Sequence, residues 1–406
     1  MKARLEVESE GMTDTKRIEF TFPVGYHEFH KSQVFNFQLN RWYSFGYARL
    51  EDMEYVAPRI NSFAEWKAEM LSQAEKADAE GRLMNAAFYY RAAEFYTFEE
   101  DPDKERFYDR FIELFYEAFK DEGIERYTIP FEDSFLPAMR ISPAGGATRG
   151  TIVIHGGFDS LIEEFYSWMR FFVDRGYQVI GFEGPGQGAS RRKHGLALDY
   201  KWEQPTSTVL DYFKLDDVTL LGISMGGYFC FRAAALDTRI RRVIASGVAY
   251  DYMRFLSPPA EALSRLMFTR MRGFSNWAAH MKMVRDPGHR WSIGNLLYIT
   301  KKKTPMEAMV IVMQLNAKNL LSWLVEQDVL ILTGREDHFI PFKMHDMQMK
   351  ALTNARSVTG RVFTREEQAQ NHCQIGNTGL ALKVMADWLD KKQPGAAPAP
   401  ASSVPA

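Results

Sequence analysis

A G-x-S-x-G pentapeptide, residues 222–226, separates a short apolar run from a helix-forming segment. The apolar run, residues 218–221, predicts a buried strand, and residues 228–235 predict a helix. A sharp turn from strand to helix needs small residues on both sides of its central serine, and the two glycines of the pentapeptide supply that room. Such a turn would expose the Ser224 hydroxyl above the edge of a sheet. It would also leave the Met225 backbone N–H free, at a helix N-terminus, to donate to an oxyanion.

Two downstream segments supply the partners that a serine in such a turn needs. Residues 328–334 predict a strand ending in glycine, and Asp337 lies in the loop that follows. A later predicted strand, residues 358–363, leads to His372, which precedes the last apolar helical segment. The order serine, acid, histidine is the one that this turn uses in hydrolases. We therefore predict a triad in which His372 takes the proton of Ser224 and Asp337 orients the imidazole.

The predicted acid and base each have a competitor. Glu336 could be the acid, in which case Asp337 would only cap the helix that begins near Pro341. His338 is adjacent to the acid, and we assign it a structural role. His372 could be a surface histidine, but among nine histidines it alone follows the last predicted strand and precedes the last helix.

A second oxyanion donor is expected from the loop after the predicted strand 151–155. The candidates are the backbone N–H groups of Gly157 and Phe158, because glycines let the main chain approach a developing charge closely. The alternative is an ordinary glycine turn between strand and helix. A second glycine-rich loop, residues 181–188, lacks the spacing of a phosphate-binding loop. We interpret it as a shaped loop beside the active site.

Five segments together resemble the α/β-hydrolase superfamily, and they are HGGFDS (155–160), GFEGPGQG (181–188), GISMGG (222–227), GREDHFIP (334–341) and NH (371–372). Within it, the chain is similar to the group that contains 2,6-dihydroxypseudooxynicotine hydrolase, fungal polyketide-shortening hydrolases and FrsA-like proteins. The similarity extends upstream through Trp66, Gly81, Ala86 and residues 91–93. Glu183 departs from the group, which has Asp before Gly-Pro-Gly. The resemblance implies a mostly parallel central sheet flanked by helices, with a helical N-terminal region and an inserted helical lid.

The resemblance also implies a chemistry, namely cleavage of a ketone C–C bond, an ester or an amide without a cofactor or metal. We expect a serine hydrolase that cleaves a C–C bond of an aryl ketone or a polyketide-like diketone. A carboxylesterase or amidase acting on a medium-sized apolar substrate is one alternative, and a non-catalytic FrsA-like regulatory or binding protein is another. Intact triad residues in the required order argue against the non-catalytic alternative.

C–C cleavage next to an aromatic ring requires a proton at the leaving carbon, so an additional acid near the pocket would help. Asp251 lies shortly after the predicted strand 243–246 and is a candidate for that acid. Tyr250 and Tyr252 flank it and are candidates for contacts with a phenol of the substrate. The alternative is that Asp251 caps the first lid helix or pairs with Arg254.

The composition of the chain limits the classes of molecule that we expect it to bind. The chain has 50 basic and 52 acidic residues and a net charge of −2, which gives no basic face for nucleic acid. We expect a small-molecule substrate, no nucleic-acid partner and no membrane partner, since no apolar stretch approaches the length of a membrane span. Only two cysteines occur, without metal-ligand spacing, which favours reduced thiols and a cytoplasmic location. A homodimer formed through the aromatic-rich N-terminal region is a further expectation.

The chain divides into four predicted parts. Residues 1–24 are interpreted as a flexible leader, and residues 25–122 as a helical N-terminal region. Residues 123–391 form the predicted catalytic domain, with a methionine-rich lid inserted at about 250–325. Unbranched methionines suit an irregular apolar pocket, or simply the packing of lid on core. Residues 392–406 are predicted to be a disordered Pro/Ala tail.

Overall fold

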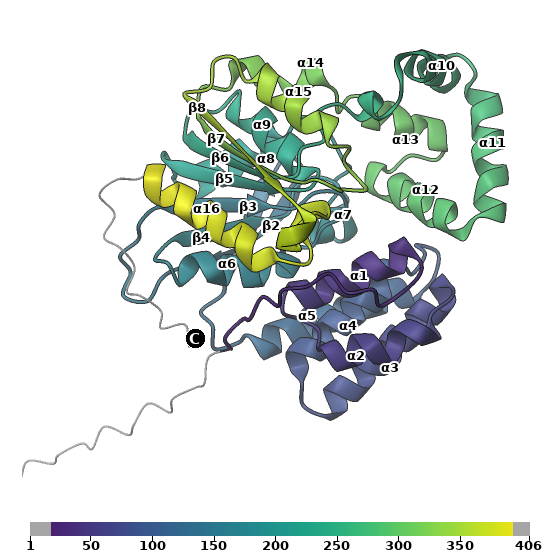
Figure 1. Ribbon diagram of the computed structural model, residues 1–406, viewed down its shortest axis with the longest axis horizontal. Coiled ribbons are helices and arrows are strands. Elements are labelled where there is room, and N and C mark those ends of the chain that lie inside the picture. The colour runs from purple at the N-terminus through teal and green to yellow at the C-terminus, as the bar shows by residue number, and fades with distance from the viewer. Residues whose placement is uncertain (1–17, 393–406) are drawn as a thin grey trace, which may run out of the picture.

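The structure is a computed structural model that describes residues 18–392 (Figure 1). Residues 1–17 of the predicted leader and residues 393–406 of the predicted tail lie outside the described range. The prediction that the flexible leader extends to residue 24 is wrong, because Phe20, within the described residues 18–24, packs against the folded protein. The Phe20 ring centroid lies 5.7 Å from that of Tyr47 and 5.9 Å from that of Phe119. Apolar packing of these aromatic rings outweighs the polar character that suggested a free leader.

Eight strands form one sheet in the described chain, in the order β1-β2-β4-β3-β5-β6-β7-β8. The first two strands form an antiparallel hairpin, β2 also runs antiparallel to β4, and all other neighbours are parallel. The strands are β1 (Glu125–Phe131), β2 (Ser134–Ile141), β3 (Thr151–His155), β4 (Gln178–Phe182), β5 (Val218–Ile223), β6 (Ile240–Ser246), β7 (Asp328–Gly334) and β8 (Ser357–Phe363). Because β5, β7 and β8 run in the same direction, the loops after them meet at one edge of the sheet.

Both faces of the parallel strands β3 to β7 are buried, which explains their largely apolar sequences, whereas β8 at the edge of the sheet is only partly buried. Successive residues alternate between two cores. Ile152 and Ile154 belong to the core beneath α6 and α16, whereas Val153 belongs to the core beneath α8 and α9. The helices of the sheet domain outside the β6–β7 insertion are α6 (Tyr166–Val173), α7 (Gly188–Arg192), α8 (Glu203–Tyr212), α9 (Gly226–Ala234), α15 (Lys343–Ala351) and α16 (Thr378–Lys392).

The N-terminal region is a helical layer fused to one face of the sheet domain (Figure 1). Its helices are α1 (Gln33–Ser44), α2 (Leu50–Val56), α3 (Phe63–Ala79), α4 (Leu83–Phe95) and α5 (Asp103–Ala118). The turn between α3 and α4 contains Gly81 at φ +73°, a left-handed conformation that favours glycine. Tyr47 stacks on Phe88 with ring centroids 3.5 Å apart, and its hydroxyl accepts a hydrogen bond from the Ser167 N–H at 2.7 Å. One apolar core therefore spans the N-terminal helices and the α6 and α16 side of the sheet.

The insertion between β6 and β7 is helical, and its helices α10 to α13 form an arc that projects from the end of the sheet (Figure 1). Its helices are α10 (Pro258–Thr269), α11 (Arg272–Arg285), α12 (Pro287–Thr300), α13 (Pro305–Val312) and α14 (Ala317–Leu320). Helix α12 contacts the N-terminal region, because the Trp291 indole donates a hydrogen bond to the Phe95 carbonyl at 2.8 Å. We call residues 250–325 the lid, as in the sequence prediction. None of the helices between residues 18 and 392 has the length and apolar character needed to cross a membrane.

Candidate active site

Ser224 occupies the tight turn between β5 and α9. Its φ of +60° is a left-handed conformation that is strained for a non-glycine residue. Both flanking glycines are required by packing: a Cβ on Gly222 would lie 2.1 Å from the Gly226 carbonyl oxygen, and one on Gly226 would lie 2.7 Å from the Gly156 carbonyl oxygen. The Ser224 N–H donates to the Ser246 carbonyl at 2.8 Å, which fixes the turn to β6. The turn thus has the strand–serine–helix context expected from the sequence.

The structure brings Ser224, His372 and Asp337 together at the carboxyl edge of the sheet. His372 Nε2 lies 2.8 Å from Ser224 Oγ, and His372 Nδ1 lies 2.8 Å from Asp337 Oδ2. The other carboxylate oxygen, Oδ1, accepts hydrogen bonds from the N–H groups of Phe339 and Ile340 at 2.8 and 2.9 Å. Two backbone donors therefore hold the carboxylate in place, and the carboxylate in turn fixes the imidazole with Nε2 directed at the serine.

The electrostatics of this group follow from burial and from one ion pair. Burial alone would raise the pKa of Asp337, but the charge and hydrogen bond of His372, with the two backbone donors, lower it. Burial alone would lower the pKa of His372, but the Asp337 carboxylate outweighs burial and raises it. The buried carboxylate therefore favours the protonated form of the His372 imidazole.

The two alternative residues, Glu336 and His338, lie outside the hydrogen-bonded series of Ser224, His372 and Asp337. Glu336 forms an ion pair with Arg365 at the surface, where its Oε1 accepts from Arg365 Nε at 3.1 Å. The His338 ring packs against Phe37, with centroids 4.9 Å apart, and borders the pocket. Burial and the charge of His372 lower the pKa of His338 to about 4, so its ring is neutral at pH 7. Of these two residues, neither occupies the position between Ser224 and a carboxylate that His372 and Asp337 define.

The loop after β3 lies directly against the serine turn. A Cβ on Gly157 would lie 2.7 Å from Met225 N and 3.0 Å from Ser224 Cβ. The Gly157 N–H donates to Ser160 Oγ at 3.0 Å. Within residues 18–392, the N–H groups of Met225 and Phe158 make no hydrogen bond with the protein. Of the two predicted second donors, Phe158 is therefore the one with a free N–H in this structure.

Asp251 does not lie where the predicted additional acid would have to be. Its Oδ1 accepts from the Met253 N–H at 2.9 Å and its Oδ2 from the Ala317 N–H at 3.2 Å. The carboxylate thus caps the turn that opens the lid and ties the start of the lid to its end, and Asp251 does not line the large pocket. The same is true of Tyr250, which packs in a small cluster with Ile340 and Met344. The structural alternative considered for Asp251 is the observed one.

A large pocket lies above Ser224, with a volume of about 660 Å³. Its walls come from the N-terminal region, the β3 loop, the triad loops and helix α12 of the lid. Aromatic side chains dominate the apolar lining and include Phe37, Phe63, Phe95, Tyr96, Phe158, Phe165, Tyr252, Phe255, Trp291 and Phe339. Tyr252 is thus the member of the predicted 250–252 group that lines the pocket, and burial followed by the charge of Asp337 raises its pKa. The shape and lining suit a largely apolar ligand with a few polar groups.

Sequence reasoning missed the polar residues of this pocket. Arg41 and Gln38 reach it from α1, a helix without any motif that marks a binding site. Asp159 follows the candidate oxyanion loop directly and accepts a hydrogen bond from the Asn295 amide of α12 at 2.6 Å. Burial raises the pKa of Asp159 to about 6, against the opposing charge of Arg91. Its position immediately after Phe158 was the available signal, since residues in that loop must lie near the serine.

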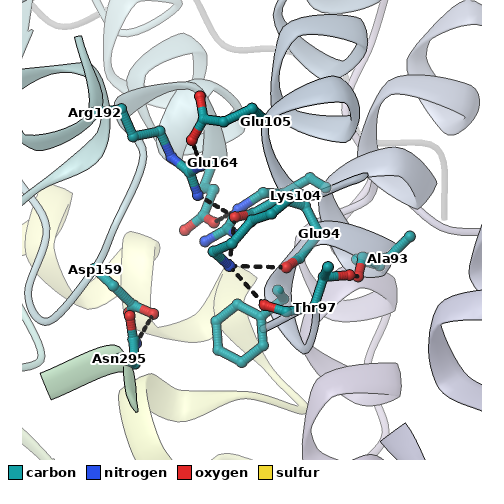
Figure 2. Close-up of polar contacts among 12 residues, drawn as sticks. Ala93, Glu94, Thr97, Lys104, Glu105, Asp159, Glu164, Arg192 and Asn295 are labelled. Carbon is teal, nitrogen blue, oxygen red and sulfur yellow. Dashed lines mark hydrogen bonds and ion pairs between the residues drawn. The ribbon is translucent and has the colours of Figure 1, made fainter. Parts of the chain in front are cut away.

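Behind Asp159, a buried ionic cluster joins the N-terminal region to the catalytic domain (Figure 2). Glu94 of α4 has no exposed side-chain surface and pairs with Arg91, with Lys104 of α5 and with Arg192 of α7. Glu164 pairs with Arg91 and with Arg41 of the pocket, at 2.5 Å each. Burial alone would raise the pKa of Glu94, but the three cations lower it. The cluster therefore fixes one wall of the pocket to the β3 loop and to α7.

Among residues 18–392, no group of three or more His, Cys, Asp or Glu side chains is arranged to hold a metal ion. Both cysteines are buried and unpaired. Cys373 lines the pocket beside His372, and its Sγ lies 3.7 Å from the Ser246 carbonyl oxygen. Cys230 lies in α9, and burial raises the pKa of its thiol.

Comparison with known proteins agrees with this architecture. Residues 152–296 match the model of a family described as alpha/beta hydrolase fold. The structure superposes on the crystal structure of a 2,6-dihydroxy-pseudo-oxynicotine hydrolase with a TM-score of 0.64 at 22% sequence identity, and the alignment covers 90% of this chain and 99% of that chain. The chain has an α/β-hydrolase fold. The fold class and the resemblance predicted from the sequence are confirmed, including the helical N-terminal region.

Two fungal hydrolases are also similar to this chain over most of their length. It is 28% identical over 370 residues to Hydrolase acrC of Aspergillus aculeatus, covering 80% of this chain and 84% of that protein. It is 27% identical over 410 residues to 20-hydroxy-prefusarin hydrolase FUS2 of Gibberella moniliformis, covering 90% and 97%. Because both alignments span more of the chain than residues 123–406 contain, the similarity to both proteins extends into the N-terminal region.

Proposed function

We propose that this α/β hydrolase is a serine hydrolase with Ser224 as nucleophile, His372 as general base and Asp337 as the acid that orients it. The observation that carries the proposal is the pair of 2.8 Å hydrogen bonds that links the three side chains beneath an apolar pocket. A nucleophile, a base and an orienting carboxylate in this arrangement are the requirements for covalent catalysis by serine. The free N–H groups of Met225 and Phe158 are the proposed oxyanion donors.

In the proposed reaction, Ser224 Oγ attacks a carbonyl carbon while its proton passes to His372 Nε2. The carbonyl oxygen becomes an oxyanion that accepts hydrogen bonds from the two backbone donors. Collapse of the adduct breaks the bond to the leaving group, which keeps the electron pair and takes the proton from His372. A water molecule then repeats the sequence, with His372 as base, and releases the acid product and free Ser224.

We propose a C–C bond of a polyketide-like diketone or an aryl ketone as the scissile bond. Because Asp251 is fully engaged by backbone donors, the proton for the leaving carbon comes from His372. Protonation by His372 alone suits a leaving carbon that is next to a second carbonyl or is part of a hydroxylated ring. The electron pair left on that carbon is then delocalised, as an enolate or onto the ring and its hydroxyl groups. Two of the similar proteins are named as hydrolases of 20-hydroxy-prefusarin and of 2,6-dihydroxy-pseudo-oxynicotine, and these names support this substrate class.

An ester is the second candidate bond, and the capped state of Asp251 favours it. Ester cleavage expels an oxygen, which needs only the proton carried by His372. A carboxylesterase acting on a medium-sized apolar ester would use the same pocket and the same three residues. We also propose a cytoplasmic location, since Cys230 and Cys373 are free thiols.

The first experiment identifies the nucleophile. A fluorophosphonate probe should label the wild-type protein and the Ser292→Ala variant, which changes another serine of the pocket lining, but not the Ser224→Ala variant. Mass spectrometry of the labelled peptide gives the modified residue. Label that persists in Ser224→Ala would refute the assignment of the nucleophile, and an unlabelled wild type would favour a non-catalytic binding protein.

The second experiment identifies the bond. A 2,6-dihydroxyphenyl alkyl ketone and the phenyl ester of the same acyl chain are incubated with wild type and Ser224→Ala, and the products are separated and quantified. Ketone cleavage that depends on Ser224 supports the C–C assignment. Cleavage of the ester alone would replace it with the esterase assignment.

A further inference from the structure

Helix α11 presents an apolar face to solvent. Phe274, Trp277, Met281 and Val284 follow one another at intervals of three, four and three residues, so they lie on one side of the helix. Their exposed fractions range from 37 to 81%. We call these four residues the lid stripe. The rings of Phe274 and Trp277 lie next to each other, with centroids 5.8 Å apart.

The lid stripe continues onto the neighbouring helix and its connection. Leu263 and Leu266 of α10 and Met271 between the helices are also exposed, by 45 to 57%. Helices α10 and α11 form the outer edge of the lid, the part farthest from the sheet (Figure 1). Ser275 is the only buried residue of either helix. This many exposed large apolar side chains on two neighbouring helices are typical of an interaction site rather than of a free protein surface.

The charges on α11 determine which partner fits. Its sequence contains Arg272, Lys282 and Arg285 and no acidic residue. Within the described chain, none of these three cations forms an ion pair or a side-chain hydrogen bond. A second copy of α11 would bring cations against cations, which opposes self-association. An exposed stripe of Trp, Phe, Met and Val with unpaired cations instead matches a helix that lies in the surface of an anionic membrane.

The lid stripe lies close in sequence to residues that line the pocket, which connects this surface to substrate entry. Val284 at the end of α11 is two residues from Asp286, which lines the pocket, as do His289 and Ser292 of the following helix. Other pocket-lining residues, Val34 and Phe339, have large exposed fractions, so the pocket reaches the surface. A lid held in a lipid surface by α11 would therefore bring this opening close to the apolar phase in which an apolar substrate dissolves.

We propose that α10 and α11 form a docking surface for an anionic lipid membrane, with Phe274 and Trp277 inserted below the headgroups and Lys282 and Arg285 contacting them. The lid stripe lies flat in the surface and spans no part of the membrane. This revises the expectation that the protein has no membrane partner. The inference does not depend on the identity of the scissile bond or on the nucleophile.

Vesicle co-sedimentation tests the proposal with the full-length protein. The vesicles consist of phosphatidylcholine with about one third phosphatidylglycerol, or of phosphatidylcholine alone. We expect binding to the anionic vesicles that weakens as salt is added. Removing the two cations in K282Q/R285Q should weaken it about 30-fold, since each cation near an anionic surface contributes a factor of about five.

Two further variants separate docking from a general effect on the protein. F274S/W277S should abolish vesicle binding, because both side chains are the proposed insertions. Trp323→Ser is the matched control, since Trp323 is also exposed, by 44%, but lies outside α10 and α11. Circular dichroism and fluorophosphonate labelling, neither of which requires vesicles, check that the variants are folded.

Three results would overturn the proposal. The first is equal binding to anionic and neutral vesicles, and the second is anionic binding that F274S/W277S retains. The third is a wild-type dimer in light scattering that F274S/W277S converts to a monomer, because the lid stripe would then be covered by a second copy. Loss of fluorophosphonate labelling by Ser224→Ala bears only on the hydrolase chemistry, so the two proposals fail independently.

Discussion

Replacing Glu94 by Gln should destabilise the protein by leaving one buried cation without a partner. Glu94 pairs with Arg91, Lys104 and Arg192, but these cations have different alternatives. Arg91 retains Glu164 at 2.5 Å, and Arg192 retains Glu105 at 2.6 Å. Lys104 retains only carbonyl oxygens, those of Thr97 at 2.9 Å and of residue 94 at 3.2 Å. The perturbation therefore acts mainly through the ammonium of Lys104 (Figure 2).

The expected magnitude follows from that single uncompensated charge. Removing one partner of a buried ion pair costs about 3–5 kcal/mol. For a chain of this length, such a loss lowers Tm by about 5 °C. The double variant Glu94→Gln/Lys104→Met removes the stranded charge as well and should recover more than half of the loss. Glu105→Gln is the matched control, because the Glu105 side chain is 52% exposed and its surface pairs contribute about 1 kcal/mol or less.

The assay is thermal and urea unfolding followed by circular dichroism at several pH values. The pKa of Glu94 is lowered in the folded protein, so its contribution is complete above the ordinary glutamate pKa and is lost as pH falls through the folded value. The difference between wild type and Glu94→Gln should accordingly be largest at neutral pH and shrink below about pH 4.3. A loss under about 1 kcal/mol at pH 7, or a double variant no more stable than the single one, would refute the reasoning.

Three further predictions concern the site. Asp337→Asn should lower kcat by about 10⁴-fold. In the proposed mechanism His372 acts as base in its neutral form, and Asp337 raises the pKa of His372, so the rising limb of kcat/KM should move to lower pH in this variant. An unmoved limb would contradict this electrostatic role. Gly226→Ala should reduce both stability and activity, since its Cβ would lie 2.7 Å from a carbonyl oxygen, whereas Gly294→Ala, with no atom within 4 Å of the added Cβ, should unfold at the same or a higher temperature. Burial raises the pKa of Asp159 to about 6, so its carboxylate ionises between pH 5 and 7, and KM for an apolar substrate should rise over this range because a charge in the pocket wall disfavours an apolar ligand. In Asp159→Asn the KM should stay constant. A wild-type KM that is flat over this range would argue against the prediction.

The sequence predicted the parts of the fold that depend on local pattern. The buried strands and the glycines of the Ser224 turn follow from short-range spacing. The meeting of Ser224, Asp337 and His372 follows from their place after strands, because a parallel sheet puts the loops after its strands at one edge. The acid was distinguishable from Glu336 only by its place in the loop, and the structure adds the backbone donors that hold it.

Features that depend on tertiary packing were not predictable in the same way. Asp251 has the composition and position of an active-site acid, but the orientation of the first lid turn directs it to backbone N–H groups instead. Arg41 reaches the pocket because α1 packs across the sheet domain, and no local motif records that packing. Phe20 was placed in a free leader because its local sequence is polar, while two of its aromatic partners, Phe119 and Tyr166, lie far along the chain.

The loop that carries His372 is held by residues from the opposite end of the sequence. The Gly25 N–H donates to the Gly376 carbonyl at 2.7 Å, and the Gly376 N–H donates to the Ser44 hydroxyl at 3.1 Å. During synthesis, Ser224 leaves the ribosome 148 residues before His372, whereas Gly25 and Ser44, which hold the His372 loop, are made before either of them. In a nascent chain the His372 loop would therefore be the last part of the proposed triad to reach its place, because it docks onto a segment made more than 300 residues earlier.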